Sequence, residues 1–383
     1  MKIEFEAGMF SSLLIVGNGF DCSLKANTRY EDFYKLLIKA YEASTFDDFI
    51  KSCDEKYRRD DLESFFNLLK EETTINYFIN YFISYNKAFD CWVDFESELE
   101  RIIVSFDQLV TVLKDPNKLE YHGYDLCIRV MDNLNLVSVI LNYPKNRFFK
   151  AEIYNEQLLF FAIRGVSLDD YKNLYNGINK FIKTFPKELY KDLSSFSRLF
   201  STYLYIIRDD ITYNVSHPFC KDCKVVINYN YTDYLGHYYK RKDYKLNDIL
   251  YVNGKCDFKK HRDKIVFGID SNVIIKNNEF FIFTKTAQRS AKNTEINRIT
   301  YIVENYSIKE IFVYGHSLNT ADKDTLEYIF KNCRGYSGEK AKITVYCYDN
   351  ESKLSAIANL KEILGLEYYM DLQTNGNLVL KDI

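Results

Sequence analysis

The sequence predicts a doubly wound, Rossmann-like α/β fold in which helices cover both faces of a mostly parallel sheet. Residues 12–16 form a short apolar run that ends at Gly17, which is typical of a fully buried strand in a parallel sheet. Further strand signals, short β-branched or aromatic runs bounded by polar residues or glycine, return after about residue 215, and helical patterns lie between several of them. Strands that alternate with helices in this way form parallel sheets, because each helix carries the chain back across the sheet.

The later elements are placed by their apolar patterns. Short runs bounded by polar residues or glycine predict strands at residues 224–229, 249–252, 264–267, 280–283, 310–314 and 343–348. Apolar residues at helical spacing predict helices at residues 295–304, 325–332 and 353–364. The carboxyl edge of the resulting sheet is where ligands bind in open α/β folds.

A long helical region separates the first strand from the others. From Tyr30 to about residue 215 apolar residues recur at helical spacing, with breaks expected near Pro116, Pro144 and Pro186. We therefore predict a large helical insertion after the first strand, which covers the carboxyl edge of the sheet. The predicted organisation is one domain over residues 1–383, with an α/β core at 1–29 and 216–383 and the insertion at 30–215.

Composition argues against several classes of protein. The chain has 51 basic and 54 acidic residues and a formal charge of -3, so no overall field attracts nucleic acid or an anionic membrane. Its 9 cysteines follow no regular spacing, and the sequence has no signal-peptide pattern and no apolar run approaching about 18 residues. We expect a cytoplasmic protein without disulfides and without a membrane segment.

The nearest approach to a metal site is the group His217, Cys220 and Cys223, which Cys256 or His237 would have to complete. A second pair of residues at zinc-binding spacing is missing. We therefore interpret these cysteines as incidental and expect no metal.

The segment directly after the first strand reads Gly17-Asn18-Gly19-Phe20-Asp21. Glycine on each side of Asn18 allows a sharp turn whose backbone N–H groups approach a phosphate closely, since no Cβ intervenes. The third glycine of the usual dinucleotide-binding fingerprint is missing, and no acidic residue follows a second strand at its spacing. From the residues alone, a phosphate-binding turn and an ordinary tight turn stay equal alternatives.

The sequence around this turn resembles a known family. Residues 14–21 continue into Thr28-Arg29-Tyr30-Glu31-Asp32-Phe33, which is similar to the opening signature of AbiH abortive-infection proteins. Further segments that agree in order are Trp92 to Glu96, Asn230 to Asp233, Val266 to Asp270, and Tyr314 to Leu318 followed by Asp322. These landmarks span residues 14–322 and cover most of the chain.

AbiH proteins in turn resemble the sirtuin-like nucleotide-binding superfamily. This resemblance implies that NAD is the ligand or substrate, and that NAD is hydrolysed to nicotinamide and ADP-ribose in antiphage defence. It also implies that Asn230 contacts the nicotinamide ribose, while Gly315 and Ser317 hold the adenosine side. The nucleotide-binding residues expected are Gly17, Asn18, Gly19, Phe20, Asp21, Thr28, Gly254, Gly268, Asp270, Gly315, Ser317 and Asp322.

One position departs from the family pattern. Where AbiH and sirtuin-like enzymes carry His-Gly at the end of a strand, this chain has Asn253-Gly254. Histidine accepts a proton near neutral pH, whereas a carboxamide does not act as a base, although it orients hydroxyl groups or water. Either another residue is the base, or this chain binds its nucleotide without the usual chemistry.

Few residues are candidates to replace that histidine. Cleavage of the nicotinamide glycosidic bond mainly requires stabilisation of an oxocarbenium-like ribose and a positioned water molecule. His316 follows a strand, and Asp322 follows it closely, but a histidine that is hydrogen-bonded within a turn is an equal interpretation of His316. The expected catalytic residues are Asp21, Glu96, Asn230, Asn253 and His316.

Two further side chains have competing interpretations. Trp92, the only tryptophan, is one helical turn before Glu96, and we interpret Trp92 as a core residue. A Glu96 that reaches the ligand pocket stays an alternative to a structural role for this carboxylate. Lys285 follows a predicted strand and suits a phosphate contact, but a solvated surface lysine is the favoured interpretation.

Two other functions stay open. Basic clusters with interleaved aromatic residues at 239–242 and 259–262 are typical of contacts with single-stranded nucleic acid, which would fit an RNase-like toxin, although loops with solvated basic residues are favoured at both. A non-catalytic nucleotide sensor is favoured by Asn253. The expected partner is a nucleotide, a homo-oligomer is compatible with the apolar helices, and neither nucleic acid nor a membrane is expected.

Overall fold

The computed structural model describes residues 12–73, 76–85, 92–114, 168–256, 264–270 and 273–383. The chain divides into two compact units. The first, here called the core unit, comprises Met1–Arg29, Ile207–Val266 and Gln288–Ile383. The second, the helical unit, comprises Tyr30–Ile206 and Phe267–Ala287.

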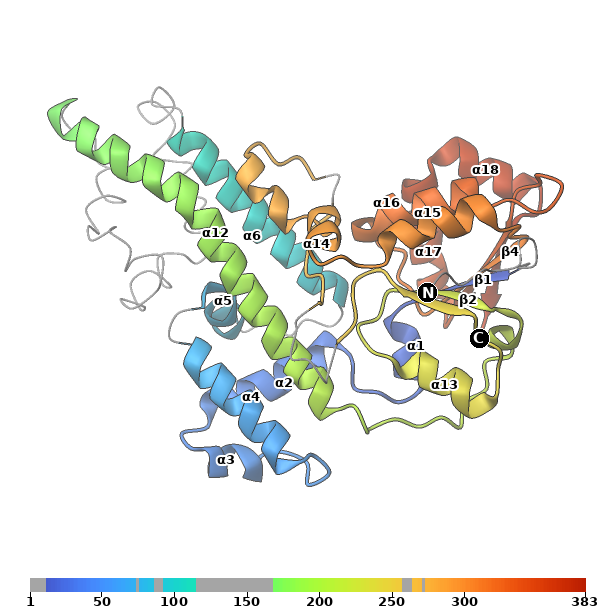
Figure 1. The fold of residues 1–383 in the computed structure, drawn as a ribbon, viewed down its shortest axis with the longest axis horizontal. Coiled ribbons are helices and arrows are strands. Elements are labelled where there is room, and N and C mark those ends of the chain that lie inside the picture. The colour runs from blue at the N-terminus through green and yellow to red at the C-terminus, as the bar shows by residue number, and fades with distance from the viewer. Residues whose placement is uncertain (1–11, 74–75, 86–91, 115–167, 257–263, 271–272) are drawn as a thin grey trace, which may run out of the picture. The chain divides into compact units, whose positions relative to one another are not determined.

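The described part of the core unit contains one parallel sheet of six strands in the order β3-β2-β1-β4-β5-β6 (Figure 1). The strands are β1 Ser12–Val16, β2 Val225–Asn228, β3 Asp248–Tyr251, β4 Glu310–Tyr314, β5 Lys342–Cys347 and β6 Leu378–Asp382. Every pair of neighbours is parallel. The predicted α/β fold with a parallel sheet is therefore confirmed, and most of the strands come from the second half of the chain as expected.

Side chains of β1 alternate between two apolar layers. Leu13 and Ile15 face a cluster built with the helices α15 Ile296–Asn305, α16 Lys323–Asn332, α17 Asn350–Leu364 and α18 Leu366–Thr374. Leu14 and Val16 face a cluster built with α1 Asn18–Ser23, α13 Tyr234–Lys242 and the 3-10 helix η1 Pro218–Asp222. Helices thus cover both faces of the sheet (Figure 1), which explains why all β1 side chains after Ser12 are apolar.

Four neighbouring strands, β3, β2, β1 and β4, end at the same level. Val16 is level with Asn228 and with Tyr314, and Asn228 is level with Tyr251. Because the strands are parallel, the residues that follow them all emerge at the carboxyl edge of the sheet.

The helical unit is built around an aromatic core. Its helices are α2 Tyr30–Glu42, α3 Phe46–Lys51, α4 Arg59–Glu72, α5 Tyr77–Tyr85, α6 Trp92–Leu113, α12 Leu168–Ile206 and the 3-10 helix η2 Asn278–Phe283. Phe95 packs on Phe196 with ring centroids 5.6 Å apart and on Phe267 at 5.4 Å. The predicted helical region between the first strand and the rest is therefore present in the described residues.

Several expected boundaries were wrong. Residues 264–267 form no strand, and residues 280–283 belong to η2, because Phe280 and Phe283 pack on the same side of a helical turn. The strand β6 was not predicted. The expected break at Pro186 is also absent: α12 continues through it, and the buried residues Phe185, Leu189 and Leu193 around it fix the helix by packing. Pro116 and Pro144 lie outside the described residues.

No helix in the described ranges combines the length and the apolar character needed to cross a membrane.

Candidate functional site

The candidate site lies at the carboxyl edge of the sheet, where β1 and β4 are neighbours although they are far apart in the sequence. The helix α1, which follows β1, and the helix α16, which follows β4, belong to the apolar layers on opposite faces of the sheet. Such a change of direction between adjacent strands is the position at which open α/β sheets bind ligands.

The turn that follows β1, residues 17–21, is here called the β1 turn. Its glycines bring its backbone close to the backbone of the loop that follows β4. The N–H of Gly17 donates to Tyr314 O (3.2 Å), that of Gly19 donates to Gly315 O (2.8 Å), and that of Phe20 donates to Gly17 O (2.9 Å). A Cβ atom on Gly19 would lie 2.6 Å from the Cα of Gly315. These three amides are thus engaged within the protein, and the glycines are required for the contact between the loops that follow β1 and β4.

Asp21 is a buried carboxyl group at the end of this turn. It is 1% exposed, its Oδ1 accepts from Asn230 Nδ2 (3.0 Å), and its Oδ2 accepts from Thr232 Oγ1 (2.5 Å). Burial raises the pKa of Asp21 to about 7, although both hydrogen bonds act in the opposite direction. Asp21 therefore titrates near neutral pH and holds two residues that follow β2.

The Asn230 carboxamide has one fixed orientation. Its Nδ2 also donates to the carbonyl oxygen of Gly17 (3.1 Å), so both amino hydrogens have acceptors. Asn230 is 5% exposed, and no described residue donates to its Oδ1. The site thus offers a preoriented acceptor for a ligand hydroxyl group or a water molecule.

A second buried cluster surrounds Arg289, which lies in the helix α14 Lys285–Ala291 and is 1% exposed. Its Nη2 donates to Asp322 Oδ1 (2.6 Å) and to Asn253 Oδ1 (2.9 Å), and its Nη1 donates to Asp324 Oδ1 (3.1 Å). Burial lowers the pKa of Arg289, but its neighbours, with Asp322 and Asp324 foremost, together raise it, and the net direction is upward. The guanidinium therefore stays charged and joins the loop after β3 to the loop after β4.

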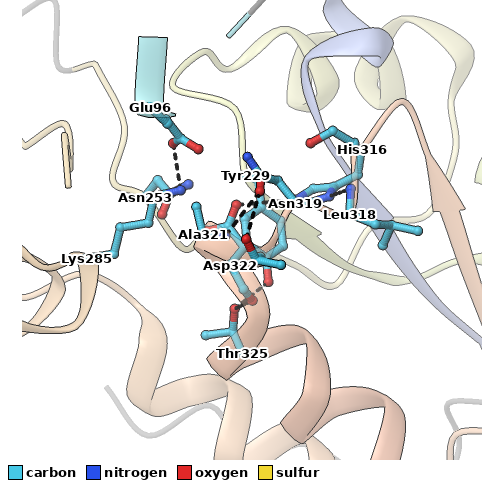
Figure 2. Close-up of polar contacts among 12 residues, drawn as sticks. Glu96, Tyr229, Asn253, Lys285, His316, Leu318, Asn319, Ala321, Asp322 and Thr325 are labelled. Atoms are coloured by element: carbon cyan, nitrogen blue, oxygen red, sulfur yellow. Dashed lines mark hydrogen bonds and ion pairs between the residues drawn. The ribbon is translucent and has the colours of Figure 1, made fainter. Parts of the chain in front are cut away.

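His316 is held by its own turn. Its Nδ1 accepts from the N–H of Leu318 (2.9 Å), and its Nε2 lies 3.7 Å from Asp322 Oδ2 (Figure 2). A neutral ring that accepts at Nδ1 carries its proton on Nε2. Taking up a second proton would require Nδ1 to give up the Leu318 N–H, so the turn opposes the role of base that the sequence allowed for His316.

Tyr229 supports this histidine. The two rings meet edge to face with centroids 4.4 Å apart, and the Tyr229 hydroxyl lies 2.8 Å from Thr325 Oγ1 (Figure 2). Thr325 Oγ1 in turn donates to Asp322 O (3.0 Å). Burial raises the pKa of Tyr229, so the phenol stays protonated and serves as a structural hydrogen-bond partner.

We expect Tyr229→Phe to lower the free energy of unfolding by only about 1 kcal/mol, because one neutral hydrogen bond is lost while Thr325 keeps its bond to Asp322 O. Urea denaturation measures this value. Tyr336→Phe is the control, since Tyr336 is 85% exposed and should show no change. A loss above about 3 kcal/mol for Tyr229→Phe would contradict the assignment of a single hydrogen bond.

The helical unit contains a separate buried ion pair. Lys285 Nζ lies 2.7 Å from Glu96 Oε1, and the two side chains are 1% and 8% exposed. Burial and the charges of Asp270 and Glu96 raise the pKa of Glu100, which lies one turn beyond Glu96 on α6. The interpretation of Lys285 as a solvated surface lysine was therefore wrong: Lys285 compensates a carboxylate that is buried with it.

The model for "Bacteriophage abortive infection AbiH" matches residues 13–346, from β1 to β5. The chain belongs to the AbiH family. Membership indicates a phage abortive-infection defence protein. No curated protein and no solved structure matches the chain significantly.

In this AbiH protein, the residues predicted from the sequence divide between the two units. The core unit contains Gly17, Asn18, Gly19, Phe20, Asp21, Thr28, Asn230, Asn253, Gly254, Gly315, His316, Ser317 and Asp322. The helical unit contains Glu96, Gly268 and Asp270. Within the core unit, the structure brings together Asp21 with Asn230, and Asn253 with Asp322 through Arg289.

Other predicted residues have contacts of their own. Thr28 Oγ1 donates to Asn18 Oδ1 (2.6 Å), which ties the end of this segment back to the β1 turn. Ser317 is exposed, and its carbonyl accepts from Asn359 Nδ2 (2.9 Å). Gly254 lies against the backbone of Lys264. Whether these residues bind a nucleotide stays a prediction.

Sequence reasoning missed Thr232, Arg289 and Asp324. Thr232 was within reach, because it belongs to the Asn-Tyr-Thr stretch that carried the family resemblance. Arg289 had no such signal, since it lies in none of the quoted motifs and its partners are 33 to 36 positions away.

The cysteines and basic residues that raised alternatives have structural explanations. Burial raises the pKa of Cys220 to about 12, so its thiol stays protonated, and no group of potential metal ligands was found among the described residues. Residues 240–242 form the last turn of α13 instead of the expected loop, and Arg241 stacks on Tyr213 (4.5 Å). Residues 259–262 lie outside the described residues.

Proposed function

We propose that this AbiH protein binds NAD or a related nucleotide at the carboxyl edge of its sheet and hydrolyses NAD to nicotinamide and ADP-ribose during phage infection. The observation that carries the proposal is the Asn230 carboxamide, which is 5% exposed and whose acceptor oxygen is held in place by Gly17 O and Asp21. It lies beside the strand crossover at which this class of sheet binds nucleotides.

Hydrolysis of the nicotinamide glycosidic bond requires few functional groups from the protein. Water adds to C1′ of the nicotinamide ribose while the glycosidic C–N bond breaks, its electron pair leaves with nicotinamide, and the proton of the water passes to solvent. Nicotinamide departs as a neutral molecule, so no general acid is needed. In this proposal Asn230 Oδ1 accepts from the water or a ribose hydroxyl group, and the negative charge of Asp21 favours the oxocarbenium-like ribose.

The test is nicotinamide release from NAD by the purified protein, with ADP-ribose binding measured by calorimetry. Asn230→Ala should reduce release about 100-fold or more, as expected when one preorganised polar contact of a transition state is lost. Asn332→Ala is the control, because Asn332 is an exposed carboxamide on α16 whose Nδ2 donates to Tyr328 O within the same helix. Equal rates in Asn230→Ala and wild type would reject the assigned site.

A non-catalytic nucleotide sensor is the second candidate, and the held His316 ring and the absence of histidine at position 253 favour it. Binding of ADP-ribose without nicotinamide release would select the sensor. No binding of any nucleotide, together with retarded RNA on a gel, would reject both in favour of a nucleic-acid toxin.

A further inference from the structure

Asn253 has the opposite orientation to Asn230. Both Nε and Nη2 of Arg289 donate to Asn253 Oδ1, at 3.2 and 2.9 Å. A guanidinium has donors only, so the carboxamide oxygen must face it and the amino group must point away. Asn253 is 4% exposed, and no described residue accepts from its Nδ2.

Arg289 is itself held by two carboxylates in addition to Asn253. Asp322 and Asp324 each pair with it, and Arg289 and Asp322 are 1% and 9% exposed. A buried charge with these partners cannot rotate away without breaking both ion pairs. The orientation of Asn253 is therefore set by the charged cluster, although Asn253 is uncharged.

We infer that Arg289 is a positioning residue that fixes Asn253 with its amino group toward the nucleotide, so that position 253 recognises an acceptor oxygen of the ligand. This inference rests on the proposed nucleotide binding. Asn230 follows β2 and offers an acceptor, while Asn253 follows the neighbouring strand β3 and offers a donor. The pair selects a ligand that carries a hydroxyl group and an acceptor oxygen, as ribosyl phosphates do.

The donor also changes what position 253 does. A base at this position would remove a proton from a ribose hydroxyl group, whereas a carboxamide donor leaves that proton in place. In this inference, position 253 therefore recognises the ligand but does not accept a proton from it.

The first experiment tests the contact between Arg289 and Asn253 without ligand. Arg289→Lys keeps the positive charge but loses the planar guanidinium with its two donors to Asn253 Oδ1. Asn253→Leu keeps the side-chain volume but loses the oxygen that accepts these bonds. Each should lower the melting temperature, and the double variant should fall by less than the sum of the two, because both remove the same contact. Additive shifts would overturn the role of Arg289.

The second experiment tests the donor by calorimetry with ADP-ribose. Asn253→Asp keeps an oxygen against Arg289 but replaces the amino group by an acceptor, and we expect at least a 10-fold weaker affinity with the fold retained in circular dichroism. Arg289→Lys should weaken binding in the wild-type background but not in Asn253→Leu. Asn332→Ala is the control and should bind as wild type.

The outcomes separate the two proposals. Unchanged affinity in Asn253→Asp and Asn253→Leu, with wild-type binding present, would overturn the inference alone. No binding by the wild-type protein would reject the nucleotide proposal and with it the ligand assigned to the Asn253 amino group, while the melting experiment would still decide whether Arg289 holds Asn253.

Discussion

Gly315→Ala is expected to destabilise the core unit by about 4 kcal/mol or more, or to prevent its folding. Gly315 has φ +63, a conformation that costs an alanine roughly 1 kcal/mol. The larger cost is steric: a Cβ at this position would lie 2.4 Å from Phe20 N and 2.6 Å from Gly19 C. Both atoms are backbone, so relief requires the loops after β1 and β4 to separate and to lose the bond from Gly19 N to Gly315 O.

Gly338→Ala is the matched control for this variant. Gly338 has φ +85, but nothing lies within 4 Å of an added Cβ, so it carries only the conformational cost of about 1 kcal/mol. Denaturant unfolding of both variants isolates the steric part as their difference. Similar losses in the two variants would show that the close approach of the two loops is unimportant for stability.

The same contact explains why the role of the β1 turn could not be decided from the sequence. Gly17 and Gly19 permit close approach of a phosphate and of another backbone equally well, and a linear sequence does not say which partner is present. The structure supplies Gly315, which lies nearly 300 positions later in the chain, as the partner of both. Sequence patterns report that a close approach is needed, but not the identity of the approaching group.

The fold was predicted best where burial dictates composition. β1 and β4 lie in the middle of the sheet and are apolar after their first residues, Ser12 and Glu310, and their predicted bounds agree with the structure. The edge strand β6 is only partly buried, so its residues show no distinctive pattern. Residues 280–283 were wrongly predicted as a strand, because a short aromatic run fits a strand and a buried helical turn equally.

For the site, the sequence identified residues that lie next to strand ends and missed those that act across the fold. Asp21 was selected from the glycine turn after β1, and Asn230 from the family resemblance, and both lie close after strands that end at the carboxyl edge. Arg289 and Asp324 meet through tertiary structure between α14 and α16. Without a known fold, neither spacing nor composition connects these two residues.

Asp21→Asn should remove a pH dependence that Asp21 imposes on the stability of the wild-type protein. The folded state holds the Asp21 proton up to about pH 7, whereas the unfolded chain releases it near the ordinary value of 3.8. The folded state therefore binds more protons in this interval, and the stability contributed by the neutral form declines as the pH rises from about 4 to 7. Three pKa units correspond to about 4 kcal/mol. Relative to wild type, the free energy of unfolding of Asp21→Asn should therefore rise by this amount as the pH increases from about 4 to 7.

Denaturant unfolding of both proteins at several pH values measures this difference. Asp349→Asn is a control of opposite sign, because hydrogen bonds from Ser352 lower the pKa of the Asp349 carboxyl, so its contribution is present at neutral pH and is lost on acidification. If the free energies of unfolding of wild type and Asp21→Asn change in parallel between about pH 4 and 7, burial does not raise the pKa of Asp21 into this range.

The same variant tests why the protein keeps a destabilising charge. An asparagine at position 21 still offers Oδ1 to Asn230, and the bond from Asn230 Nδ2 to Gly17 O does not depend on Asp21, so the Asn230 acceptor should stay in place. We therefore expect Asp21→Asn to bind ADP-ribose with wild-type affinity and to lose nicotinamide release. Wild-type release by this more stable variant would mean that the negative charge of Asp21 is not required for the reaction, whereas its loss with binding intact would assign the charge to the transition state.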